Sequence, residues 1–195
     1  MATATASKNL VLGDLVRSVS DVLALEREPG QMVRWVGGAL RPFLGNPYLL
    51  TPEQRQPDPI RYRQHILHAD ERGRFSIVAL VWLPGQATAV HDHISWCVVG
   101  IHEGQECEVQ YQVVSEGVDQ YLLAIGESTH KEGSIAVLQP PGDVHTVYNP
   151  GPKTAVSIHI YGGDVRKNGS SICCRYDLPV VETLPRSFRR YVAAG

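Results

Sequence analysis

The sequence predicts a mainly β protein, an antiparallel barrel or double-sheet jelly roll, with α-helices packed outside it near the N-terminus. Two observations predict this fold class. From about residue 60 onward, short β-prone runs alternate with turn-forming residues at close spacing, which is typical of barrels and sandwiches. Before about residue 45, apolar residues recur at helical spacing instead. The 195 residues are expected to form one domain, because that length can bury one sizeable core.

We expect a helical part at about 8–45, a β-barrel at about 60–165 and a C-terminal tail at 166–195. A second helix is expected from about Gln31 to Arg41, because Pro42 cannot continue it. The proline-rich stretch 46–59 is expected to be a surface connector. The first helix is predicted from an apolar stripe at helical spacing, formed by Leu12, Leu15, Val16, Val19, Val22 and Leu23.

The expected strands are short runs rich in β-branched and aromatic residues. Turn-forming pairs such as Pro84-Gly85 and Glu103-Gly104 separate them. A strand at 172–176 would return to the edge of a sheet. The main runs lie at 66–67, 75–82, 96–101, 107–114, 121–125, 134–138 and 155–161.

Composition narrows the classes of function. The formal net charge is -2 and there is no basic run, so nucleic acid is not an expected partner. No apolar stretch approaches the roughly 20 residues that span a membrane, and the N-terminus lacks the apolar segment of a signal peptide. The four cysteines form no recognised zinc spacing and are expected to be reduced. A cytoplasmic location is therefore expected, and no oligomeric state is predicted.

Two histidines, His91 and His93, stand one residue apart. Side chains alternate faces along a strand, so both can bind one metal ion from a single short segment. Such pairs also arise by chance, and the sequence around them decides their meaning. Gly85, His91, His93, Cys97 and Gly104 follow the spacing of the first cupin motif, with cysteine where glutamate is usual.

A second cupin motif follows downstream, in which Pro140-Pro141-Gly142 precedes His145 and Asn149. The chain from Gly85 to about Tyr161 therefore resembles the cupin superfamily, which implies a double-stranded β-helix, the jelly-roll barrel. Three imidazoles on one side of an octahedral ion leave about three positions open for other ligands. Imidazole suits Fe, Zn, Cu or Ni, so the ligands alone do not name the metal.

Ser157, His159 and Tyr161 alternate with Val156, Ile158 and Ile160. Period-two spacing puts the three polar side chains on one face of a strand. That face either looks into the barrel, near the metal, or faces solvent from an edge strand while the isoleucines pack in the core.

Together, the His-Asp-His segment, the strand with Trp96, the Pro-x-Gly-Asp-Val-His segment and the Ser-x-His-x-Tyr strand resemble the thiol dioxygenases, the cysteine dioxygenase family of cupins. Those enzymes bind Fe(II) through three histidines and add both atoms of O2 to a thiol, giving a sulfinate. The resemblance implies that His91, His93 and His145 bind iron. It also implies that Ser157, His159 and Tyr161 orient the substrate and oxygen.

The expected substrate is a small thiol carboxylate. In animal-type cysteine enzymes an arginine on an early strand pairs with the substrate carboxylate, and Gln64 stands at the matching position here. Glutamine there is similar to the 3-mercaptopropionate dioxygenase branch, which takes its arginine from the segment after the tyrosine. Arg166 is the matching candidate, with Arg63 and Arg175 as rivals. Trp96 is a further candidate for lining the pocket.

Cys97 departs from the 3-mercaptopropionate branch, which usually has glycine there. The animal cysteine enzymes cross-link a comparable cysteine to the tyrosine of the strand through a thioether. Cys97 and Tyr161 are therefore candidates for a cross-link. The competing interpretation is a small buried hydrophobic residue, the role that free cysteine commonly takes.

The predicted function is a non-haem Fe(II) dioxygenase of a small mercapto-acid, with 3-mercaptopropionate as the expected substrate and cysteine as the alternative. A second class of function stays open, a cupin isomerase or lyase that uses another metal, or a binding module without catalysis. The Ser-x-His-x-Tyr strand separates the two classes, because a binding module does not need a phenol and an imidazole beside its metal.

Overall fold

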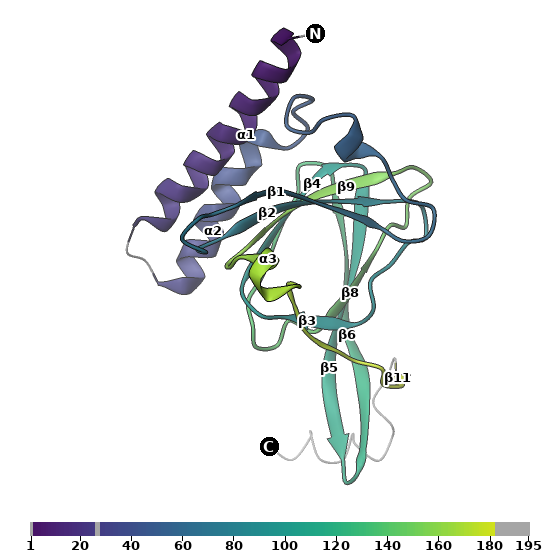
Figure 1. The fold of residues 1–195 in the computed structure, drawn as a ribbon. Coiled ribbons are helices and arrows are strands. Elements are labelled where there is room, and N and C mark those ends of the chain that lie inside the picture. Colours follow the sequence, from purple (N-terminus) through teal and green to yellow (C-terminus); the bar gives the residue numbers. More distant parts are fainter. Residues whose placement is uncertain (1, 26–27, 182–195) are drawn as a thin grey trace.

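The computed structural model describes residues 2–25 and 28–181, with side chains from residue 10 onward. Its strands form two sheets that face each other as a barrel, and two helices lie outside the barrel (Figure 1). The predicted mainly β fold with external N-terminal helices is confirmed. Residues 182–195 of the predicted C-terminal tail lie outside the described residues.

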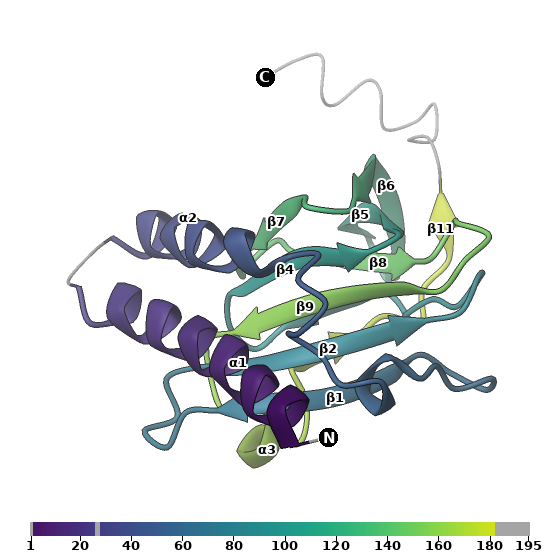
Figure 2. The ribbon, with the colours of Figure 1, turned by 90° about the horizontal axis from the view of Figure 1, so that it is seen from above.

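Both predicted helices are present. Helix α1 spans Ala2–Leu23 and α2 spans Pro29–Leu40, close to the bounds expected for the second helix. Figure 2 shows the two helices side by side across the outer face of one sheet. The expected connector 46–59 contains only one short 3-10 turn, η2, Glu53–Arg55, and another, η1, Arg41–Phe43, follows α2. Within the described part of the chain, no helix combines the length and apolar character needed to cross a membrane.

The first sheet has five strands, and neighbours in its order pair antiparallel. In spatial order they are β1 Arg63–Ala69, β2 Ser76–Trp82, β9 Ala155–Tyr161, β4 Cys97–Glu103 and β7 Ile135–Leu138. The strand of the predicted polar row, β9, is therefore central in its sheet. This position excludes the interpretation that it is an edge strand.

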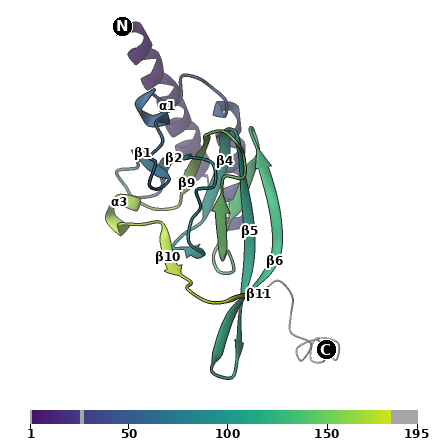
Figure 3. The same cartoon turned by 90° about the vertical axis from the view of Figure 1, so that its right-hand side faces the viewer.

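The second sheet has six strands, and the short ones β3 and β8 carry the histidines of both cupin motifs. Its order is β10 Ile172–Arg175, β3 His91–His93, β8 His145–Tyr148, β5 Gln105–Glu116, β6 Asp119–Lys131 and β11 Val180–Val181. The predicted return strand is confirmed as β10, which pairs with β3. A short helix, α3, Val165–Asn168, precedes β10. Figure 3 shows β5 and β6 as a long hairpin that extends beyond the barrel.

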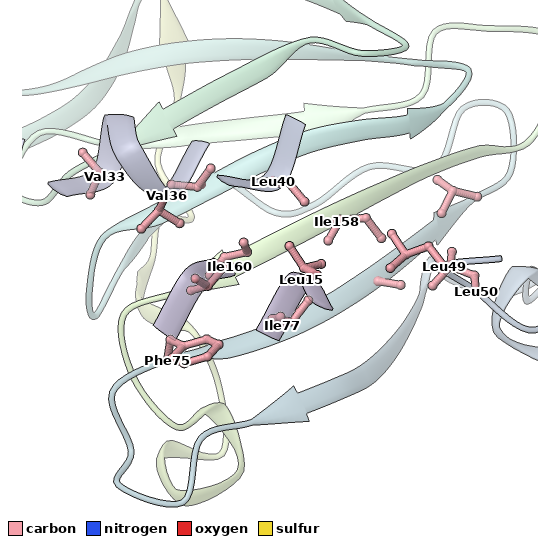
Figure 4. Close-up of a cluster of buried hydrophobic side chains, with 14 of the residues drawn as sticks. Leu15, Val33, Val36, Leu40, Leu49, Leu50, Phe75, Ile77, Ile158 and Ile160 are labelled. Atoms are coloured by element: carbon pink, nitrogen blue, oxygen red, sulfur yellow. The ribbon is translucent and has the colours of Figure 1, made fainter. Parts of the chain in front are cut away.

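The strands β2 and β9 are buried at every residue, because each has one face under the helices and the other inside the barrel. Alternation along the strand sorts the side chains into two cores. Val156, Ile158 and Ile160 of β9 belong to the helix-side core, which Figure 4 shows between α1, α2 and the sheet. Tyr161 belongs to the core inside the barrel. The apolar stripe of α1 joins the helix-side core through Leu15 and Val19, which are fully buried.

Two adjacent glycines of α2 have different surroundings. A Cβ atom on Gly37 would lie 2.9 Å from Ile135 Cγ2, on a side chain that branches at Cβ and is therefore stiff. A Cβ on Gly38 would meet nothing within 4 Å. Gly37 therefore sets how closely α2 approaches β7.

We predict that Gly38→Ala stabilises the protein by about 0.5–1 kcal/mol, because alanine costs less backbone entropy in a helix. Gly37→Ala has the same intrinsic gain but overpacks the contact with Ile135, and we expect a net loss on the order of 1–2 kcal/mol. Denaturant unfolding of both variants beside the parent protein measures the difference. Equal free energies of unfolding for the two variants would contradict the close approach of α2 to the sheet.

Candidate active site

The structure brings the three predicted metal ligands together inside the barrel. His91 and His145 face each other across the β3 and β8 pairing, and His93 lies two residues along β3. One ring nitrogen of each residue lies within 4.8 Å of those of the others. The three side chains are nearly buried, with relative exposures of 5%, 5% and 3% for His91, His93 and His145.

A hydrogen bond at Nδ1 holds each imidazole in place. His91 Nδ1 lies 2.9 Å from the carbonyl oxygen of Ala89. His93 Nδ1 lies 2.8 Å from Asp143 Oδ2, and His145 Nδ1 lies 2.7 Å from Glu108 Oε1. These acceptors favour the tautomer that carries its proton on Nδ1, so Nε2 of each ring has a free lone pair.

The donor set fits a metal ion. His145 Nε2 is buried without a hydrogen-bond partner among the described residues, which is costly for a polar atom unless something else binds it. Burial lowers the pKa of His91 to about 4, with a further contribution from the charge of His145, and burial also lowers the pKa of His93. Both rings are therefore neutral at pH 7, as a metal ligand must be. The three histidines are the candidate metal centre.

The predicted polar row on β9 faces into the barrel and is hydrogen-bonded along its length. Ser157 Oγ lies 2.9 Å from His159 Nε2, and Tyr161 OH lies 3.2 Å from His159 Nδ1. Burial, followed by the charges of the three metal-site histidines, lowers the pKa of His159 to about 3. His159 is therefore neutral and carries a single ring N–H, which can serve only one of its two neighbours.

Trp82 supports the far end of the row, because its indole N–H donates to Ser157 Oγ over 3.2 Å. At the near end, the Tyr161 ring centre lies 6.0 Å from that of His93. The row therefore runs from the barrel interior to the metal centre and ends in a phenol.

Cys97 lies directly opposite Tyr161 in the pairing of β4 with β9. Its Sγ is 3.9 Å from His159 Nδ1, and the side chain is fully buried. Burial raises the pKa of the Cys97 thiol well above its ordinary value, so the thiol is protonated. The arrangement places the cysteine beside the phenol, as both the cross-link and the packing interpretations require.

Two connected cavities lead to the metal centre. A chamber of about 30 Å³ is lined by the three histidines, His159 and Tyr161. An outer cavity of about 550 Å³ shares Tyr62, Gln64, Tyr161, Ser171 and Ile172 with that chamber. The predicted substrate-binding residue Gln64 therefore lies where the two cavities meet.

The outer cavity is cationic. Arg61, Arg63 and Arg175 line it, together with one acidic residue, Asp58. Burial raises the pKa of Tyr62, and the positive charges of Arg175 and Arg61 oppose that rise, so both arginines act on a residue of the inner chamber. Two of the three arginines, Arg63 and Arg175, are the predicted rivals of Arg166.

Arg166 and Trp96 line neither cavity. The Arg166 guanidinium donates to both carboxylate oxygens of Asp164 at 3.1 Å, and its side chain is 54% exposed. Trp96 packs beside the helix-side core and against Gly162. The structure therefore does not bring these two predicted substrate-binding residues to the chamber.

Three buried carboxylates inside the barrel were not predicted from the sequence. Asp143 and Glu108 hold the metal-site histidines, and Glu106 lies near Ser157 and Trp82. Burial would raise the pKa of Glu108, but hydrogen bonds with His130 and His145 outweigh it and lower the pKa to about 2. Asp143 stands just before β8 but pairs with His93 on β3, a long-range contact that sequence spacing does not indicate.

The sequence model of the family described as cysteine dioxygenase type I matches residues 55–168. A curated relative, cysteine dioxygenase type 1 of Danio rerio, is 26% identical over 106 residues, which are 53% of this chain and 52% of the relative. The chain thus spans about half the length of that relative.

Solved structures with similar coordinates include a cupin 2 conserved barrel domain protein from Salinispora arenicola, 20% identical with a TM-score of 0.41. That match covers 57% of this chain and 83% of the other. A protein with a double-stranded β-helix domain from Klebsiella pneumoniae is 23% identical with a TM-score of 0.40, and the match covers 57% and 85% of the two chains.

We predict that Asp143→Asn lowers the affinity for a divalent metal by about 10- to 100-fold, because the acceptor that orients His93 loses its charge. Asp92→Asn is the matched control. Asp92 stands between the two ligands, but its oxygens accept from Cys174 N at 2.7 Å and Tyr176 OH at 2.8 Å, away from the metal centre. Competition with a chromophoric chelator measures both affinities, and an equal loss in the two variants would contradict the role of Asp143.

Proposed function

Because the chain belongs to the cysteine dioxygenase type I family, we propose that it is a non-haem iron thiol dioxygenase that converts a small mercapto-acid to a sulfinate. The observation that carries this proposal is the row of Ser157, His159 and Tyr161, which opens onto the chamber of three histidines. An isomerase or a binding module has no need of such a row. The proposed location is the cytoplasm, where the four free cysteines would stay reduced.

The proposed reaction needs no external reductant. A thiolate sulfur gains two oxygen atoms and loses four electrons, and one O2 molecule accepts those four electrons. An Fe(II) ion held by His91, His93 and His145 would supply the affinity for thiolate and dioxygen and the redox chemistry. Three neutral imidazoles leave the full charge of the ion to attract an anionic sulfur.

The protein's own contribution is to position the substrate and exclude water. Tyr161 lines both cavities, so its phenol can hydrogen-bond to a substrate that has reached the chamber. His159 holds the phenol, and Ser157 holds His159. The chamber of about 30 Å³ admits little more than the reacting groups, which keeps bulk water away from them.

The charge of the outer cavity supports 3-mercaptopropionate over cysteine. With three arginines against one aspartate, the cavity has a net positive charge. That charge attracts a carboxylate and disfavours the ammonium group that cysteine also carries. A guanidinium matches a carboxylate in shape, so Arg63 and Arg175 are proposed in place of Arg166 as the carboxylate partners. Gln64 is proposed to donate to the substrate at the entrance of the chamber. Asp58 is the one observation that favours the alternative, cysteine, because it could pair with the ammonium group.

We expect Cys97 to be a free buried thiol that packs beside Tyr161, because its pKa is raised and the thiolate is the reactive form. The intact mass of the purified protein should then match the sequence, and Cys97→Ala should differ from it by the substitution alone. A mass lower by two hydrogens, restored in Cys97→Ala, would show the thioether cross-link instead.

The test of the proposed function is oxygen uptake by iron-loaded protein with four thiols: 3-mercaptopropionate, cysteine, mercaptosuccinate and cysteamine. We expect the highest kcat/KM for 3-mercaptopropionate, less for cysteine, and none for cysteamine, which has no carboxylate. One sulfinate should form for each O2 consumed. No uptake with any thiol despite bound iron would refute the proposed function and favour a binding module or another cupin activity.

Arg175→Gln and Arg166→Gln form a matched pair for the carboxylate partner. We expect Arg175→Gln to raise the KM for 3-mercaptopropionate by about 10-fold or more, since a hydrogen bond to a charged group contributes about 1.5–3 kcal/mol. Arg166→Gln should leave KM near its original value, because that guanidinium pairs with Asp164. The reverse order of effects would return the carboxylate site to Arg166.

A further inference from the structure

Glu106 lies at the far end of the row that begins at Tyr161. It is on β5, is 2% exposed, and its carboxyl group lies within hydrogen-bonding range of the Ser157 hydroxyl and the Trp82 indole. Its Oε1 is buried without a hydrogen-bond partner among the described residues. The row therefore has four members, and its last one is a titratable group that the proposed reaction does not yet use.

The surroundings of Glu106 make both of its protonation states accessible. Burial raises its pKa to about 7, although hydrogen bonds with Ser157 and Trp82 and the charge of His130 act to lower it. The negative charge of Glu108 acts in the same direction as burial. The groups that face it are Glu108 on its own strand, His130 on β6, Trp82 on β2, Cys97 on β4, and Ser157 and Tyr161 on β9.

The protonation state of Glu106 fixes the direction of every hydrogen bond in the row. An ionised Glu106 can only accept, so the Ser157 O–H points to it and Ser157 Oγ accepts from His159 Nε2–H. His159 Nδ1 is then an acceptor and engages the Tyr161 O–H. In this state the phenol proton points along the row, away from the substrate.

A protonated Glu106 reverses these bonds. Its O–H donates to Ser157 Oγ, and the Ser157 O–H turns to donate to His159 Nε2. His159 then carries its proton on Nδ1 and donates to the phenol oxygen, so the Tyr161 O–H is free to point into the chamber. In both states Ser157 Oγ makes one donated and two accepted bonds, counting that from Trp82, so neither leaves it unsatisfied.

We propose that Glu106 is a positioning residue of the thiol dioxygenase, which directs the Tyr161 hydroxyl toward the substrate by holding one proton at the opposite end of the row. The change adds one proton to the row, at Glu106. In each hydrogen bond between Glu106 and Tyr161 the donor and the acceptor exchange roles, so no other proton is gained or lost. The inference rests on the proposed function for its effect on turnover. The structural part of the inference, that the Glu106 carboxyl titrates and is coupled to the row, does not rest on the proposed function.

The first test compares Glu106→Gln with Glu127→Gln. The glutamine amide donates to Ser157 as a protonated acid does, so it locks the row in the direction that frees the phenol. Glu127 is on β6 in the same hairpin and contacts Tyr148 and Cys107, outside the chamber. In the parent protein and in Glu127→Gln, kcat should fall about tenfold per pH unit above the pKa of Glu106. In Glu106→Gln that alkaline decline should be absent.

The second test needs no turnover. Difference infrared spectra of the protein, metal-free and iron-loaded, should show a buried carboxylic acid that ionises between about pH 5 and about pH 9. The band should be absent in Glu106→Gln and unchanged in Glu127→Gln. Iron should shift its ionisation to lower pH, because a nearby dication stabilises the carboxylate.

Tyr161→Phe links Glu106 to the phenol. In that background, Glu106→Gln should no longer change the pH profile of the residual activity, because no hydroxyl remains to be turned. An alkaline decline that persists in Glu106→Gln, or a carboxylic acid band that survives there, would overturn the inference. Absence of turnover in the parent protein would refute the proposed function instead, while the infrared titration would still decide whether Glu106 holds the proton.

Discussion

The structure depends on the two-sided burial of the central strands of its five-stranded sheet. The helices cover the outer faces of β2, β9 and β4, so these strands must turn their other faces into the barrel. Any polar side chain on those inner faces is cut off from water and must find its partners inside. This constraint forces Ser157 and His159 into one hydrogen-bonded row and aims it at the metal-site histidines.

Inside that barrel, carboxylates on neighbouring strands have different tasks. Glu108 and Asp143 each accept a hydrogen bond at the Nδ1 side of a histidine of the candidate metal centre, and for Glu108 these bonds with histidines keep the carboxylate ionised. Glu106, two residues from Glu108 on the same strand face, has weaker partners and one orphan oxygen. The kind of partner separates Glu108 from Glu106: hydrogen bonds with two histidines outweigh burial at Glu108, whereas the hydroxyl and indole beside Glu106 do not.

The sequence predicted the barrel, the helices, the grouping of the three histidines and three members of the row, because local periodicity and motif spacing encode them. It left open which face of β9 is inward, since that depends on β9 lying between β2 and β4, a long-range pairing. The sequence also did not indicate that Glu106 is buried. Along β5 this charged residue alternates with the apolar Cys107, a pattern that normally puts the glutamate side chain in solvent. The sequence does not show that Asp164 pairs with the Arg166 guanidinium, which is why Arg63 and Arg175 are proposed in its place.

The stretch that matches the cysteine dioxygenase family ends at residue 168, yet the entrance to the metal centre is completed further along the chain. Ser171 and Ile172 line both cavities and Arg175 lines the outer one, all from the segment that β10 attaches beside β3. The proposed substrate-binding wall is thus split, with Arg63 and Gln64 inside the matched stretch and Arg175 beyond it, so the matched stretch alone does not carry the whole proposed selectivity.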